Sequence, residues 1–214
     1  ELNYFNATVW EITDSAGLRK LKDPKVVRSR WVLCNKGDAA NPDVRARLVA
    51  CEVNTNGTKE DSFYASTPPL EAKKMLFSQS TSRKSKRGRV LKLQFIDIKR
   101  AYFHAPAKRD VYVDLPQEEF EEGMCGKLRM SMYGTRDAAQ NWEACYTEAM
   151  LNAGFTQGKS NPCVFRNSRM DLTTVIHGDD FTTLGDNESL EWLEIKLKES
   201  FELVVKARLG PEDG

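Results

Sequence analysis

A run of strong β-forming residues at positions 90–98 constrains the fold of this chain more than any other feature of its sequence. The side chains alternate, so one face of the predicted strand ends in Asp97 after three apolar residues. Those apolar residues are Leu91, Leu93 and Phe95. An acidic side chain at the end of an apolar strand face makes Asp97 a candidate functional residue.

Strand and helix patterns alternate downstream of that strand. A helix is predicted after Asp137, which stands three residues before Gln140 in capping-box spacing, and Gly154 is expected to end it. A second helix is predicted from an N-cap at Asn187, with an apolar stripe that reaches Phe201. Further strands are predicted over residues 111–115, 127–132, 163–166, 172–176, 181–184 and 202–206. This order predicts an α+β fold with a ferredoxin-like (split βαβ) antiparallel sheet that carries two helices on one face.

A hairpin is predicted near the N-terminus, with strands over residues 30–35 and 44–53 and turn residues between them. The turn signal Asn56-Gly57 is expected to end the second strand. Arg45 and Arg47 lie two residues apart in that strand, so they should project from one face.

A helix is predicted after the hairpin. Thr67 precedes two prolines, a pattern typical of an N-cap followed by a proline in the first turn. Apolar residues at helical spacing extend the prediction to about Ser80.

Length and composition exclude several classes of protein. The 214 residues, 40% of them hydrophobic, suffice for one domain with an attached lobe. No apolar run approaches the roughly 20 residues that cross a bilayer, so no membrane partner is expected. The five cysteines are Cys34, Cys51, Cys125, Cys145 and Cys163. An odd, widely spaced set without a CxxC pair argues against a zinc module or a disulfide scaffold, and favours a reducing intracellular compartment such as cytoplasm or nucleus.

Charge is divided along the chain although the net charge is only +1. Residues 1–110 hold 22 Lys and Arg against 12 Asp and Glu, whereas residues 111–214 hold 10 against 19. The first half can therefore attract a polyanion, and the second can attract cations. A basic run at residues 83–92 is predicted to form an exposed loop, which either contacts nucleic-acid phosphate or is simply solvated.

The adjacent carboxylates of Asp179 and Asp180 are expected at the tip of a tight hairpin. Two like charges side by side are unfavourable unless a cation neutralises them, and Mg²⁺ prefers such oxygen ligands. If the strand that ends at Asp97 lies beside this hairpin, Asp97 and Asp179 can hold two Mg²⁺ ions about 3.5 to 4 Å apart. Because neighbouring strand residues point to opposite faces, this pattern favours Asp179 over Asp180 as a direct ligand. A solvated acidic turn is the alternative.

Several blocks around these carboxylates occur in an order that resembles the reverse transcriptase of copia-type LTR retrotransposons. Each block is short, but together they extend from about residue 30 to 210. The blocks are Arg30-Trp31-Val32, Arg45-Ala46-Arg47-Leu48-Val49-Ala50, Phe95-Ile96-Asp97-Ile98-Lys99-Arg100-Ala101-Tyr102-Phe103-His104, Val111-Tyr112-Val113 with Leu115-Pro116, Lys127-Leu128, Met132-Tyr133-Gly134, Trp142, Gly154-Phe155 and Gly178-Asp179-Asp180.

The resemblance implies a right-hand polymerase, with fingers at residues 1–90, a palm at 91–210 and a truncated end at 211–214. It implies an RNA-directed DNA polymerase that uses two Mg²⁺ ions, with Mn²⁺ as a substitute. Its partners would be an RNA or DNA template with a primer, dNTP and the rest of a retrotransposon polyprotein. Primer grip, thumb and RNase H would lie outside this fragment.

The resemblance also assigns roles to individual residues. The catalytic and metal-binding carboxylates would be Asp97, Asp179 and Asp180, with the carbonyl of Ile98 as an additional metal ligand. Tyr102 would pack under the sugar and exclude a ribose 2′-hydroxyl. The remaining substrate-binding residues would be Arg45 and Arg47 at the triphosphate, with either one directed inward, and Tyr133 and Gly134 on the floor of the nucleotide pocket.

The chain departs from the family pattern at two places. His177 stands where the family usually has tyrosine, and Thr135-Arg136-Asp137-Ala138-Ala139 replaces the usual Leu-Lys-Gln-Ala-Pro. These departures leave a second hypothesis, a catalytically decayed or truncated remnant that acts at most as a nucleic-acid-binding module. A third hypothesis is a metal-dependent nuclease, which would need the carboxylates but neither Tyr102 nor the arginine hairpin.

Overall fold

The computed structural model describes residues 2–15, 18, 26–53 and 63–211. It divides into two compact units, and each unit combines two separate stretches of sequence. The first unit comprises residues 1–64 and 102–142, and the second comprises residues 65–101 and 143–214. The expected single division at residue 90 therefore does not coincide with the compact units. None of the helices in the described part of the chain is both long and apolar enough to cross a membrane.

The first unit contains a small mixed sheet with the strand order β1-β7-β6-β2. The bounds of these strands are β1 Trp10–Asp14, β2 Val26–Val27, β6 Tyr112–Val113 and β7 Met124–Leu128. Short helical turns accompany them: α1 Leu2–Tyr4, η1 Phe5–Val9, η3 Ala101–His104 and η4 Gln117–Glu119. β2 runs parallel to β6, whereas the other pairs are antiparallel. The core of the unit is aromatic, because the Phe5 ring packs against Trp10 and Phe103 with centroids 4.8 and 5.0 Å apart.

The predicted strand over residues 127–132 has the wrong bounds, since β7 lies at Met124–Leu128. Gly123, with a φ of +79°, precedes β7. After Leu128 the backbone leaves the sheet, because the N–H groups of Arg129 and Met130 both donate to the carbonyl of Val9. The predicted strand over residues 111–115 also shortens, to the two residues of β6.

The predicted N-terminal hairpin is confirmed as β3 Ser29–Asn35 and β4 Val44–Ala50, paired antiparallel throughout. β4 ends three residues earlier than predicted, and the expected Asn56-Gly57 turn lies outside the described residues.

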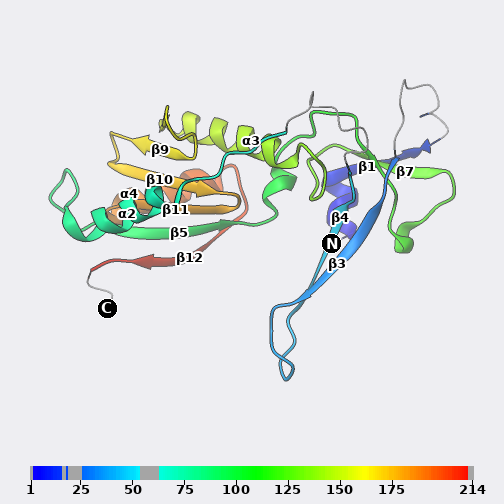
Figure 1. Cartoon of the computed structure of the whole chain (residues 1–214), viewed down its shortest axis with the longest axis horizontal. Helices are drawn as coiled ribbons and strands as arrows, with labels where there is room; N and C mark the ends of the chain where they lie inside the picture. Colours follow the sequence, from blue (N-terminus) through cyan, green and yellow to red (C-terminus); the bar gives the residue numbers. More distant parts are fainter. Residues whose placement is uncertain (1, 16–17, 19–25, 54–62, 212–214) are drawn as a thin grey trace. The chain divides into compact units, whose positions relative to one another are not determined.

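The second unit is built on a six-stranded antiparallel sheet with the order β12-β5-β11-β10-β9-β8 (Figure 1). The bounds of its strands are β5 Lys92–Ile98, β8 Thr156–Gln157, β9 Val164–Asn167, β10 Leu172–His177, β11 Asp180–Gly185 and β12 Leu203–Leu209. The helices are α2 Leu70–Ser82, α3 Ala138–Asn152, whose first residues belong to the first unit, and α4 Asn187–Lys198. β5 is an interior strand, flanked by β12 and β11.

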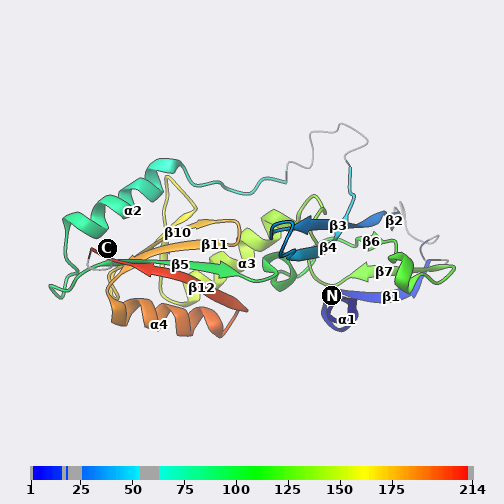
Figure 2. The same cartoon turned by 90° about the horizontal axis from the view of Figure 1, so that it is seen from below.

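Helices cover both faces of this sheet, as the position of α2 opposite α4 shows (Figure 2). On one face, Leu76 of α2 belongs to a buried cluster with Leu93 and Leu184. On the other face, Tyr146 of α3 contacts the ring of Phe181, with centroids 6.0 Å apart. α4 lies on this second face too. Gln94 and Ile96 point to the same side of β5, and Ile96 is opposite Phe181, so Gln94 lies on the Phe181 face. The Gln94 side chain donates a hydrogen bond to Glu194 of α4.

Two predicted helix starts are wrong. The N-cap of α2 is Pro69 rather than Thr67, because a residue before proline is held out of the helical region and Pro68 precedes Pro69. The N-cap of α4 is Asp186 rather than Asn187, and its carboxylate accepts a hydrogen bond from the backbone N–H of Ser189. The predicted end at Gly154 is confirmed by a φ of +78° just after α3.

Candidate active site

Asp97 and Asp180 are directly opposite each other on the neighbouring strands β5 and β11. The N–H of Ile98 donates to the carbonyl of Asp179 at 2.9 Å, which makes 98 and 179 the hydrogen-bonded pair. Residues 97 and 180 then form the adjacent non-hydrogen-bonded pair, in which Cα atoms are about 4.5 Å apart and side chains are closest. Both carboxylates therefore project from the same face at the same end of the sheet.

The turn between β10 and β11 is tighter than predicted and changes the positions of the acidic residues. The sequence left four residues, 177–180, between two strands, but His177 pairs with Asp180, so only Gly178 and Asp179 form the loop. Gly178 has a φ of +63°, as the first central residue of a two-residue hairpin turn often requires. Asp179 is thus a turn residue, whereas Asp180 begins β11.

The structure brings together one pair of the predicted carboxylates, Asp97 and Asp180, and Asp179 precedes Asp180 in the adjoining turn. Across the described ranges, no group of three or more His, Cys, Asp or Glu side chains is arranged to hold a metal ion. Two carboxylates nevertheless match the one or two that proteins usually supply to Mg²⁺.

Lys206 is a site residue that the sequence did not reveal. Val204 pairs with Asp97 across β12 and β5, and the register shifts between Val205 and Ala207. Lys206 lies in this bulge, and its Nζ is 3.5 Å from Oδ2 of Asp97. The Lys206 side chain is 56% exposed and that of Asp97 is 30% exposed, so the ammonium partly offsets the carboxylate charge while both remain accessible.

Three of the predicted nucleotide-binding residues meet in the first unit. The ring centroid of Tyr102, in η3, lies 4.5 Å from that of Tyr133, and the guanidinium carbon of Arg47 lies 5.5 Å from the Tyr133 centroid. Arg45 instead forms an exposed ion pair with Asp43 at 3.6 Å. Of the two candidate arginines, Arg47 therefore shares a cluster with both tyrosines.

Gly134 brings the segment after β4 and the Tyr133 turn into close contact. Its φ is +89°, and a Cβ atom there would come within 1.9 Å of the carbonyl oxygen of Ala50. Two backbone hydrogen bonds join the segments, from Ala50 N–H to Tyr133 at 2.7 Å and from Glu52 N–H to Gly134 at 3.3 Å. A side chain at position 134 would separate them.

A partly buried ion network supports this turn and was missed from the sequence. Arg109 donates two hydrogen bonds to Glu52, at 3.0 and 2.9 Å, and one to Asp137 at 2.7 Å. Glu52 also accepts from the N–H of Arg136, and Asp137 accepts from the side chain of Asn141. Asp137, predicted only as a helix cap, is thus an anion partner of Arg109.

The network shifts the acidity of its members. Burial opposes ionisation of Glu52 and Asp137, but hydrogen bonds from Arg109 outweigh it and lower the pKa of both carboxyls. The hydrogen bonds from Asp137 and Glu52 raise the pKa of Arg109. The three side chains therefore remain charged at neutral pH.

Comparison with known proteins places these residues in a family. The family model described as reverse transcriptase (RNA-dependent DNA polymerase) matches residues 9–210, nearly the whole chain. This chain belongs to the reverse transcriptase family. One relative is the retrovirus-related Pol polyprotein from transposon TNT 1-94 of Nicotiana tabacum, 25% identical over 89% of the chain.

Yeast relatives agree with the tobacco one. The transposon Ty1-BL Gag-Pol polyprotein of Saccharomyces cerevisiae is 25% identical over 95% of the chain, and the Ty1-DR4 polyprotein has the same identity and coverage. The chain spans only 14% of the tobacco polyprotein and 11% of the Ty1-BL polyprotein. The predicted resemblance to copia-type retrotransposon reverse transcriptases is confirmed.

Proposed function

We propose that this chain is an RNA-directed DNA polymerase that transfers a nucleotide from dNTP to a primer 3′-hydroxyl with two Mg²⁺ ions, which Mn²⁺ can replace. The observation that carries the proposal is the opposition of Asp97 and Asp180 across neighbouring strands, beside the turn that holds Asp179. In the proposal these carboxylates and the carbonyl of Ile98 hold the ions.

We further propose that the sheet of the second unit is the ferredoxin-like core of a polymerase palm, and that residues 1–90 contribute the fingers. The antiparallel strand order β12-β5-β11-β10, with α3 and α4 on one face, supports the palm assignment. The partners in this proposal are an RNA or DNA template with its primer, dNTP and the remainder of a retrotransposon polyprotein.

The chain's own residues would act by binding and positioning charge. When bound, the metal ions would supply positive charge to the reacting phosphate and lower the pKa of the attacking hydroxyl. Asp97 and Asp180, on interior strands of a sheet, present their carboxylates without the reorganisation that a loop would need. Lys206 offsets the charge of Asp97, and a metal ion would compete with that ammonium.

The aromatic cluster of the first unit would select the nucleotide. Arg47 lies over the Tyr133 ring, which would hold its guanidinium in an orientation suited to a triphosphate. Tyr102 packs against the same ring, and in the proposal its aromatic face takes the volume that a ribose 2′-hydroxyl would need.

Primer extension on an RNA template tests the proposal. With Mg²⁺, the parent chain should extend the primer, and Asp97→Asn and Asp180→Asn should each reduce extension below about 1% of the parent rate. Asp110→Asn changes an exposed carboxylate that is paired with Lys127 and serves as the matched control. Metal-independent binding of a duplex without extension by the parent would favour a decayed remnant, and nicked template without extended primer would favour a nuclease.

A further inference from the structure

The basic run that the sequence placed in a loop has a fixed conformation in the second unit. The buried Ser85 closes it, because the Ser85 hydroxyl accepts from the N–H groups of Arg87 and Arg89, and the Ser85 N–H donates to the Arg89 carbonyl at 2.8 Å. Gly88, with a φ of +75°, makes the turn between them. The loop therefore presents its side chains from a constrained backbone.

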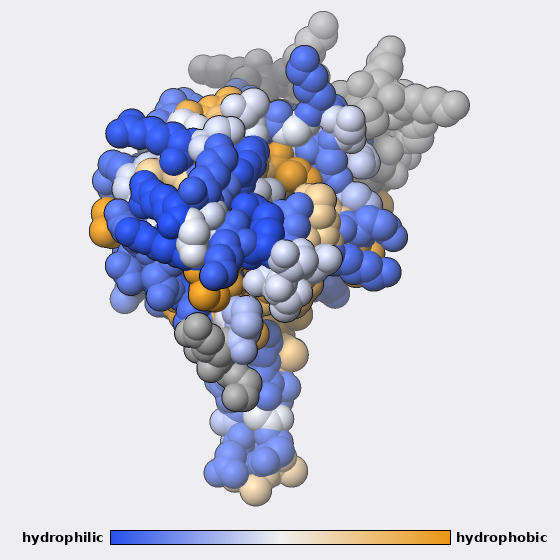
Figure 3. Space-filling model, turned by 90° about the vertical axis from the view of Figure 1, so that its left-hand side faces the viewer, coloured by the Kyte–Doolittle hydropathy of each residue, from blue (hydrophilic) through white to orange (hydrophobic). Residues whose placement is uncertain are grey.

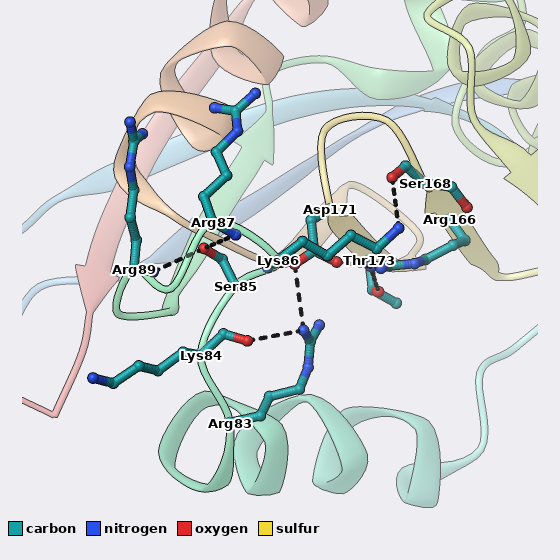
Figure 4. Close-up of polar contacts among 10 residues, drawn as sticks. All are labelled: Arg83, Lys84, Ser85, Lys86, Arg87, Arg89, Arg166, Ser168, Asp171 and Thr173. Carbon is teal, nitrogen blue, oxygen red and sulfur yellow. Dashed lines mark hydrogen bonds and ion pairs between the residues drawn. The ribbon is translucent and has the colours of Figure 1, made fainter.

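A buried carboxylate anchors this loop to the turn between β9 and β10. Asp171 accepts hydrogen bonds from the Arg166 guanidinium, from Arg83 at 3.3 Å and from the N–H of Lys86 at 2.9 Å (Figure 4). Lys86 Nζ in turn donates to the carbonyl of Ser168 at 3.0 Å. Two segments about 80 residues apart in sequence thus form one surface.

Arg87 and Arg89 extend side by side from this surface, and both are exposed (Figure 4). Their guanidinium groups share one carboxylate, that of Glu188 in the first turn of α4. Hydrophilic residues gather over the end of the unit that carries the loop (Figure 3). A single exposed carboxylate leaves two guanidinium forks incompletely neutralised, and exposed ion pairs of this kind contribute little free energy.

We infer that Lys86, Arg87 and Arg89 form a binding surface for the phosphate backbone of a nucleic acid, apart from the carboxylates of the candidate active site. Planar guanidinium forks match phosphate oxygens, and phosphates can displace the weakly held Glu188. The surface adjoins Lys92 at the start of β5, whereas Asp97 lies five residues further along, roughly 17 Å away in an extended strand.

The inference rests on the proposed function for the identity of the ligand, because a polymerase must hold a template. The charge of the surface alone would also suit an acidic protein segment. Direct binding measurements without metal ion and dNTP separate this surface from catalysis, because no nucleotide transfer can occur under these conditions.

The test measures fluorescence anisotropy of a labelled 20-nucleotide RNA, single-stranded or paired with DNA, in EDTA at several salt concentrations. The variant is the full chain with Lys86→Gln, Arg87→Gln and Arg89→Gln. We expect its Kd to rise about 10-fold or more at 100 mM salt, and the slope of log K against log salt to fall by about 2 to 3. The form of RNA, single-stranded or paired with DNA, for which the variant loses more affinity is the preferred ligand.

The matched control removes the same charge elsewhere in the unit, with Lys159→Gln, Lys196→Gln and Lys198→Gln, and its Kd should change less than about 2-fold. A variant with the opposite expected effect controls for misfolding. Glu188→Gln removes the carboxylate that pairs with Arg87 and Arg89, so it should tighten RNA binding about 3-fold. Equal RNA affinity of the parent and the triple loop variant would overturn the inference. Loss of affinity for labelled polyglutamate but not for RNA would instead assign the surface to an acidic protein.

Discussion

Replacement of Arg109 by methionine should destabilise the first unit, because it leaves two carboxylates from separate segments of the chain without the cation that they share. The Glu52 and Asp137 side chains are only 11% and 6% exposed, and Arg109 gives them three hydrogen bonds. Removal of one partner from a buried ion pair costs about 3 to 5 kcal/mol. Since the Arg109 side chain is itself 34% exposed, water can partly replace it, and we expect the lower value, about 3 kcal/mol.

Urea denaturation of the full chain, followed by tryptophan fluorescence, measures this loss. Trp10, Trp31 and Trp142 report on the first unit, and Trp192 reports on the second. Lys127→Met is the control, because it breaks an exposed ion pair with Asp110 and should cost less than about 1 kcal/mol. A loss for Arg109→Met no larger than that of the control would show that this network does not stabilise the unit.

Further predictions concern acid stability, backbone strain, helix capping and sugar selection. The pKa of Glu52 is lowered in the folded chain, so its carboxylate contributes fully to stability above its ordinary pKa of 4.5. This contribution is lost as the pH falls through the pKa of the folded state, so the urea midpoints of the parent and Arg109→Met should converge in acid. Gly134→Ala should cost at least about 2 kcal/mol in the same assay, because it adds a clash with Ala50 to a positive φ; an unchanged midpoint would contradict the backbone contact. Asp186→Ala removes the N-cap of α4 and should cost about 1 kcal/mol, and Asp186→Ser should recover most of it. If Tyr102 excludes the 2′-hydroxyl, Tyr102→Ala should raise ribonucleotide incorporation relative to deoxyribonucleotide at least about 10-fold in single-nucleotide extension, and equal selectivity would remove that role.

Local patterns were sufficient to predict most elements of the second unit. The alternation of side chains along β5 and the apolar residues at helical spacing in α3 and α4 involve only residues that are close in sequence, so both patterns can be recognised in the sequence directly. Glu194 and Lys198 form an ion pair at 2.6 Å, a contact that their spacing of four residues on α4 allows. Helix starts were less predictable, since α2 depends on the restriction that one proline imposes on the residue before it.

The site depended on strand register, which local patterns leave undetermined. The sequence favoured Asp179 as the partner of Asp97, but the two-residue turn after His177 places Asp180 opposite Asp97 instead. Lys206 reaches Asp97 from a bulge in the neighbouring strand β12, and local patterns do not reveal which strands are neighbours.

Contacts between distant segments were the least predictable part of the site. Arg109 meets Glu52 and Asp137 across 57 and 28 residues of sequence, and no periodic pattern relates the three positions. The folded backbone alone brings this charge network together.

In the proposed active site, Asp97 and Asp180 share a divalent cation. Titration of the chain with Mn²⁺, followed by electron paramagnetic resonance of the free ion, measures this binding without a requirement for polymerase activity. We predict that Asp97→Asn and Asp180→Asn each weaken Mn²⁺ binding at least about 10-fold, whereas Asp110→Asn binds like the parent. Mn²⁺ affinity that is unchanged in both Asp97→Asn and Asp180→Asn would show that these carboxylates do not bind the ion.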